Sequence, residues 1–95
     1  QYPAVEHDLA IVVDNSVTCE DLERRITSAG GKLLEGVRLF DVYRDPVRIG
    51  KGKKSMAFAL TYRSDDHTLT SEEVEKAHQK IVTKVCKGVN GEVRS

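Results

Sequence analysis

The sequence has 95 residues, enough for one domain built around a single hydrophobic core. Its 15 basic and 15 acidic residues balance, so overall charge does not predict attraction to nucleic acid or to a membrane surface, and any nucleic-acid contact must depend on local patterning. No apolar run is long enough to cross a membrane, and there is no signal-peptide pattern. Because the chain starts at Gln1 rather than at a methionine, we expect a fragment of a longer protein, although processing would give the same result.

The two cysteines, Cys19 and Cys86, lie far apart in segments predicted to be helical, without CxxC spacing. We interpret them as reduced thiols of a cytoplasmic protein, because disulfides are rare in that compartment. A disulfide and a metal site are the alternatives. The three histidines also lack the spacing of metal ligands, and we predict no metal site.

The first predicted element is a strand over residues 5–14, where apolar residues alternate. One face carries Leu9, Ile11 and Val13, and the other carries Asp8, Ala10 and Val12. A helix follows. Thr18 is its expected N-cap, Asp21 can reach back in a capping box, and Gly30-Gly31 ends it.

Two further strands, 32–43 and 55–63, form a predicted hairpin, with a bend in the first at Gly36. Strict alternation places Asp41 and Tyr43 on one face of the first strand and Phe40 and Val42 on the other. In the second strand the bulky set is Met56, Phe58, Leu60 and Tyr62, and the small set is Ser55, Ala57, Ala59 and Thr61. An unpaired carboxylate is costly to bury, so Asp41 indicates an open face.

The loop over residues 44–54 joins these strands and concentrates positive charge. Its ionisable residues are Arg44, Asp45, Arg48, Lys51, Lys53 and Lys54, and five basic minus one acidic gives +4. In a chain without net charge this is the strongest local charge asymmetry. A solvated, mobile hairpin is the alternative interpretation.

A second helix begins at a predicted capping box formed by Thr70 and Glu73. Its expected buried stripe is Val74, Ala77, Ile81 and Val85, and Gly88 is its expected end. The spacing of Lys76, Lys80 and Lys84 predicts a solvated face without a role in RNA binding. Residues 90–94 are predicted to form a short final strand.

The predicted order is β-α-β-β-α-β, which indicates the α+β class and a ferredoxin-like sandwich. Right-handed crossovers put both helices on one face of a four-stranded antiparallel sheet and leave the other face uncovered. The residues expected on that open face are Ala10, Asp41, Tyr43, Ser55 and Ala57.

The sequence contains no arrangement typical of a catalyst. No Ser/His/Asp or Cys/His set is indicated, and we predict no catalytic residue. The segment Gly50–Ser55 does not match the phosphate-binding loop, because its spacing differs and it leads into a strand rather than a helix. These observations favour a binding module.

The chain resembles the ferredoxin-fold anticodon-binding domain at the C-terminal end of the bacterial phenylalanyl-tRNA synthetase beta chain. The matching segments span Tyr2 to Arg94. They are Tyr2-Pro3 with Asp8-Leu9-Ala10, Phe40–Tyr43, Gly52–Phe58, Thr68–Val74 and Val93-Arg94. In combination and in this order they are specific, although each segment alone is weak.

The resemblance implies one domain over residues 1–95 that binds the anticodon stem-loop of tRNA(Phe). It implies that ATP- and Mg²⁺-dependent aminoacylation belongs to the alpha chain of an α2β2 enzyme, so that this domain is not itself catalytic and holds no cofactor. It also implies that Asp41, Tyr43 and Ser55 contact the first anticodon base. These are the three polar residues that alternation places on the open face.

This role agrees with the chemistry of the side chains. Tyr43 would stack on a base, a contact worth about 1–3 kcal/mol. Asp41 would accept hydrogen bonds from the ring N–H and amino group of guanine, and Ser55 would donate or accept beside it. Ala10 and Ala57 would leave room for a flat base. Phosphates would meet the basic residues Arg44, Arg48, Lys53 and Lys54.

Two positions depart from the family pattern. His7 stands where the family usually has arginine, and His67 stands where it has arginine or lysine, so each change removes a permanent charge. We predict that both are surface histidines. Two hypotheses of other classes compete: a small-molecule regulatory module on the same plan, and an acylphosphatase-like hydrolase. The hydrolase would need an arginine in the segment 14–17, which has none.

Overall fold

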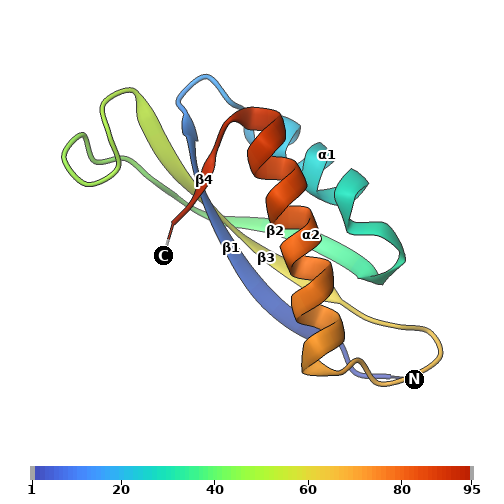
Figure 1. Ribbon diagram of the computed structural model, residues 1–95. Helices are drawn as coiled ribbons and strands as arrows, with labels where there is room; N and C mark the ends of the chain where they lie inside the picture. The colour runs from blue at the N-terminus through green and yellow to red at the C-terminus, as the bar shows by residue number, and fades with distance from the viewer. Residues whose placement is uncertain (1, 95) are drawn as a thin grey trace.

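The computed structural model describes residues 2–94, and the ends of the expected 1–95 domain, Gln1 and Ser95, lie outside the described residues. The predicted order of elements is confirmed (Figure 1). The elements are β1 (Val5–Asp14), α1 (Cys19–Gly30), a 3₁₀ turn η1 (Gly31–Leu33), β2 (Leu34–Tyr43), β3 (Lys53–Tyr62), α2 (Ser71–Val89) and β4 (Glu92–Val93).

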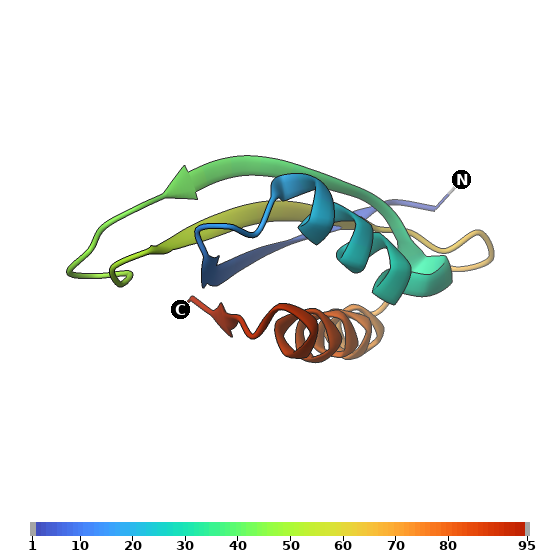
Figure 2. The same cartoon turned by 90° about the horizontal axis from the view of Figure 1, so that it is seen from above.

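The strands form one antiparallel sheet in the order β2-β3-β1-β4. Both helices lie on the same side of this sheet, and the other side is uncovered (Figure 2). This is the ferredoxin-like sandwich that the sequence predicts. The β2–β3 loop extends beyond the body of the domain (Figure 1).

The core lies between the sheet and the two helices. Each member of the predicted bulky set of β3 is at most 2% exposed. In the cross-strand register Leu9 lies opposite Phe58 and Ile11 opposite Met56, so the apolar faces of β1 and β3 form one surface. The helices cover that surface with residues that include Leu22, Ile26, Val74, Ile81 and Val85.

Two β-bulges interrupt the alternation of β2. One lies between Leu34 and Gly36, and the other lies between Leu39 and Asp41, where Phe40 is the extra residue. A bulge sets two residues against one and shifts the pattern that follows. The second bulge lets Leu39 pack against the core while Asp41 faces away from it.

The prediction that Phe40 faces the core is therefore wrong. Its ring is 49% exposed, because the bulge removes it from the alternating pattern. Val42 does lie opposite Met56, on the core side as predicted, but it is 38% exposed.

The N-terminus of α1 confirms one half of its predicted cap. Thr18 accepts a hydrogen bond from the Asp21 backbone N–H. The Asp21 carboxylate does not reach back, because it pairs with Arg24 and Arg25 one turn further along. Gly30 ends the helix as predicted, and Gly31 follows with a φ of 64°, a conformation that glycine adopts readily.

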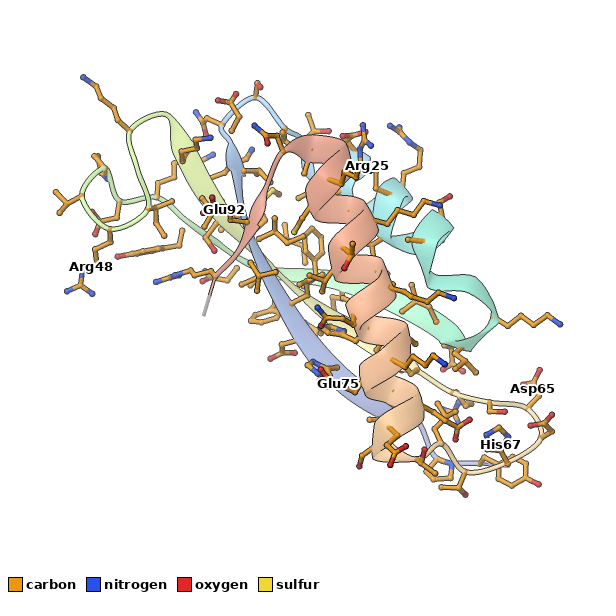
Figure 3. The ribbon with its side chains drawn as sticks, viewed as in Figure 1. Arg25, Arg48, Asp65, His67, Glu75 and Glu92 are labelled. Atoms are coloured by element: carbon orange, nitrogen blue, oxygen red, sulfur yellow. The ribbon has the colours of Figure 1, made fainter. Side chains whose placement is uncertain are left out.

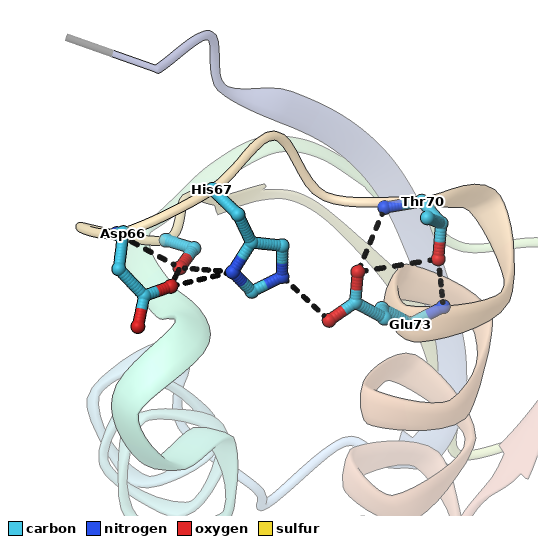
Figure 4. Close-up of polar contacts among 5 residues, drawn as sticks. Asp66, His67, Thr70 and Glu73 are labelled. Carbon is cyan, nitrogen blue, oxygen red and sulfur yellow. Dashed lines mark hydrogen bonds and ion pairs between the residues drawn. The ribbon is translucent and has the colours of Figure 1, made fainter.

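The N-terminus of α2 has the full capping box, with Thr70 and Glu73 bonded reciprocally (Figure 4). The exposed His67 adds to it. Its Nε2 lies 2.8 Å from the second Glu73 carboxylate oxygen, and its Nδ1 contacts Asp66. These carboxylates raise the pKa of His67.

Gly88 does not end α2, contrary to the prediction. The helix continues to Val89, and Asn90 terminates it in the left-handed conformation with a φ of 54°. A Cβ at Gly88 would lie 2.6 Å from Arg25 Nη1, so the glycine provides space for the arginine from α1. Arg25 reaches toward α2 at this end of the helix (Figure 3).

Candidate nucleic-acid interface

The open face of the sheet consists of cross-strand rows with one residue from each long strand. Two adjacent rows, Val12–Ser55–Tyr43 and Ala10–Ala57–Asp41, contain the predicted site residues, and the row Asp8–Ala59–Arg38 lies next to them. The five residues expected on the open face, Ala10, Asp41, Tyr43, Ser55 and Ala57, therefore occupy adjacent positions. Period two alone could not have established which strands are neighbours.

These residues differ in accessibility. Asp41 is exposed, and the two alanines are half-buried. Ser55, between Val12 and Tyr43 in its row, is only 3% exposed. In this arrangement the carboxylate is the accessible hydrogen-bonding group, and Ser55 is covered.

Two contacts hold Tyr43, and neither partner is among the sequence-predicted base readers. Its hydroxyl donates to Asp45 Oδ2 at 3.0 Å. The other carboxylate oxygen of Asp45 accepts from the backbone N–H groups of Val47 and Arg48 at 2.9 and 3.1 Å. Asp45 thus connects the start of the basic loop to the tyrosine ring.

These hydrogen bonds shift the pKa values of Tyr43 and Asp45 in opposite directions. The hydrogen bond to Asp45 raises the pKa of the Tyr43 phenol. The Arg48 backbone N–H and the Tyr43 hydroxyl lower the pKa of the Asp45 carboxyl. The phenol therefore keeps its proton, and the carboxylate keeps its charge, at neutral pH.

The second contact comes from the end of the chain. The Arg94 backbone N–H donates to the Ala10 carbonyl at 2.9 Å, which extends the β1–β4 ladder by one residue. Its guanidinium carbon lies 4.7 Å from the centroid of the Tyr43 ring, within cation–π range. The side chain of Arg94 thus extends from the β4 side of the sheet toward β2. Sequence reasoning missed Arg94 in this role, because Arg94 and Tyr43 are distant in sequence.

The four basic residues predicted to meet phosphates lie in different environments. Lys53 lies two residues before Ser55 in β3, so both residues belong to the open face. Lys53 helps line a hollow of about 300 Å³ beside Val12 and Glu92. Arg44 is exposed, with its Nε donating to Asn15 at 3.0 Å. Arg48 is exposed in the loop and points away from the body of the domain (Figure 3).

Lys54 has a different position. It lies opposite Val13, on the helix side of the sheet, and is 7% exposed. The structure does not support the predicted phosphate contact of Lys54, because alternation directs neighbouring residues of a strand to opposite faces.

The two histidines predicted at the surface differ in how accessible they are. His67 is exposed as predicted, but the His7 ring is half-buried and stacks on His78, with centroids 3.7 Å apart. Both cysteines are free thiols. Within residues 2–94, no group of three or more His, Cys, Asp or Glu side chains could hold a metal ion. No helix in the same range combines the length and apolarity needed to span a membrane.

Comparison with known proteins finds a family with the same fold and a nucleic-acid-binding name. The family model described as "Ferredoxin-fold anticodon binding domain" matches residues 1–94. The chain belongs to this family. Membership supports the anticodon-binding hypothesis over the regulatory module and the hydrolase, which rest on the fold plan alone.

Relatives of this anticodon-binding domain are named phenylalanine–tRNA ligase beta subunit. The one from Clostridium tetani is 45% identical over 94 residues, covering 99% of this chain and 12% of the relative. The one from Symbiobacterium thermophilum is 47% identical over 95 residues, covering 100% of this chain and 10% of the relative. The Bacillus subtilis protein is 50% identical over 82 residues. The chain thus spans about a tenth of the length of these relatives.

Proposed function

We propose that this chain is the anticodon-binding domain of a phenylalanine–tRNA ligase beta subunit and that its open sheet face holds the first anticodon base of tRNA(Phe). One observation carries the proposal. Asp41, Ser55 and Tyr43 lie together on a face that no helix covers, in a chain that belongs to an anticodon-binding family.

The chemistry of the site favours a guanine. Asp41 is an exposed carboxylate and accepts hydrogen bonds only, so it complements the ring N–H and amino group of guanine and not the edge of adenine. The alanines at positions 10 and 57 leave a flat floor beside it. Tyr43 provides the aromatic surface on which a single-stranded base stacks.

Arg94 lies against the ring on which the base would stack. We propose that the base enters between the arginine and the tyrosine, or displaces the arginine toward a phosphate. Lys53, Arg44 and Arg48 then meet the RNA backbone and set the salt dependence of binding, while Asp41 sets base preference.

The remaining parts of the proposal concern the whole enzyme. We propose that this domain contributes to selection of tRNA(Phe), that an alpha subunit carries the aminoacylation site in an α2β2 assembly, and that ATP and Mg²⁺ bind there. The name of the relatives supports the assignment.

The test is a titration with tRNA(Phe) anticodon stem-loops that carry guanine or adenine at the first anticodon position. Asp41→Asn keeps the size of the side chain but replaces one acceptor oxygen with a donor. We expect the parent chain to prefer guanine by about tenfold or more, since hydrogen bonds to charged groups contribute about 1.5–3 kcal/mol. We expect the variant to lose that preference.

Asp65→Asn is the matched control, because it removes the same charge from an exposed turn at the other end of the domain from Arg48 (Figure 3). The control should shift the affinity for both stem-loops equally and preserve the preference. Unchanged discrimination by Asp41→Asn in a folded chain would show that this face does not read the base.

A further inference from the structure

The bulge in β2 leaves an aromatic ring exposed in the middle of a strand. Phe40 is 49% exposed, although the neighbouring Leu39 packs against the core. About half of this ring is accessible, and it is not part of the hydrophobic core.

The exposed Phe40 ring contacts an arginine of the open face. Arg38 is opposite Ala59, which puts it on the same face as Asp41 and Ala57. Its guanidinium carbon is 6.0 Å from the centroid of the Phe40 ring, within the range of a cation–π contact. Because Arg38 starts from the open face, this contact makes the exposed Phe40 ring reachable from the open side of the edge strand β2.

The open face of β2 thus carries two arginine–aromatic pairs, one on each side of Asp41. Arg94 contacts Tyr43, and Arg38 contacts Phe40. Phe40 and Tyr43 are three residues apart, which corresponds to about 10 Å along an extended strand. That separation exceeds the thickness of one base, so the two rings can serve two different bases.

We propose that Phe40 and Arg38 form a second base-stacking position, which holds a nucleobase next to the one on Tyr43 in the same single-stranded loop. This inference rests on the function proposed above. Sheet surfaces of RNA-binding modules stack two or three successive bases on exposed aromatic residues, and the guanidinium plane of arginine stacks on bases as well.

A nucleobase fits this position better than a protein partner does. The core of a protein interface needs a contiguous apolar patch, with charged residues depleted. Phe40 instead stands between two charged residues, Asp41 and Arg38, and the open-face residues of β3 opposite those two are alanines. An isolated ring among charged groups suits a flat, polar ligand with a π-face.

The experiment uses tRNA(Phe) anticodon stem-loops in which 2-aminopurine replaces one loop base at a time. The fluorescence of this base falls when it stacks on an aromatic side chain. The parent chain, Phe40→Leu, Tyr43→Leu and Val42→Thr are titrated at low salt, where phosphate contacts are strongest. Val42→Thr is the matched control, because it changes an exposed residue of the same strand on its other face.

We expect Phe40→Leu to abolish quenching at one loop position and to weaken binding about fivefold or more. Quenching at the position lost in Tyr43→Leu should persist in Phe40→Leu, and Val42→Thr should match the parent. If Phe40→Leu keeps parental affinity and quenching at every position while Tyr43→Leu weakens binding, the second stacking position is refuted and the proposed function stands. If neither leucine variant changes binding, the proposed function fails, and this inference fails with it.

Discussion

Acidification should destabilise this domain through His78, a residue that the sequence analysis did not place in the core. The imidazole is 5% exposed, lies 2.8 Å from the Tyr62 hydroxyl through Nδ1 and stacks on His7. Burial and the nearby His7 lower the pKa of His78, and Glu75 opposes the shift. Tyr62 keeps its proton across the neutral range, because burial raises its pKa to about 12.

The free energy of unfolding depends on pH because folding and proton binding to His78 are linked. In the unfolded chain the imidazole titrates near pH 6.5, whereas the folded state favours the neutral ring. The contribution of His78 is therefore complete above about pH 6.5 and is lost as the pH falls from there through the folded-state pKa. One pH unit below the unfolded pKa, the loss is at most on the order of 1 kcal/mol, the limit that a fully neutral folded ring would set. Carboxylates with lowered pKa values, such as Asp14, act in a separate window below about pH 4.

His67 contributes with the opposite sign. Because its carboxylate partners raise its pKa, its stabilising contribution is complete below about pH 6.5 and is lost as the pH rises through the folded-state value. The two histidines therefore partly cancel in the parent chain, and single variants are needed to separate them.

The assay is urea unfolding of the parent, His78→Gln and His67→Asn at several pH values from about 7.5 to 5.5. We expect the parent to lose stability toward pH 5.5, His67→Asn to lose more, and His78→Gln to lose less than the parent across the same range. The same pH dependence in the parent and in His78→Gln would refute the assignment of this titration to His78.

Other predictions concern the core, the loop and the two faces of β3. Phe58→Ala should lower the free energy of unfolding by about 3–5 kcal/mol in urea titrations, because the ring is fully buried, and a loss below about 1 kcal/mol would contradict that packing. Asp45→Asn should lower the pKa of the Tyr43 phenol in ultraviolet titrations. In a Tyr43→Phe background the same substitution should leave the titration curve of the remaining tyrosines unchanged. Lys53→Ala should reduce the salt slope of stem-loop binding by about one, and Lys54→Ala should leave it unchanged; equal effects would contradict their placement on opposite faces.

The order of elements and the core faces of β1 and β3 were predictable from the amino-acid sequence. Alternation in β1 and β3 identified the core residues, and the capping box at Thr70 and Glu73 located the start of α2. These features depend on neighbours within a few residues, so their periodicity and chemistry are visible in one dimension. The open face followed from the order of elements and the handedness of crossovers.

Contacts between residues distant in sequence depend on how the whole chain packs. The bulge that exposes Phe40 depends on the register between β2 and β3, because an extra residue in one strand is defined only against its partner. Arg94 reaches Tyr43 only because β4 pairs with β1. His78 is buried because α2 packs on the sheet at a particular rotation, which brings it beneath Tyr62 and His7. Register, strand order and helix rotation result from the packing of the whole chain, and no local pattern determines them.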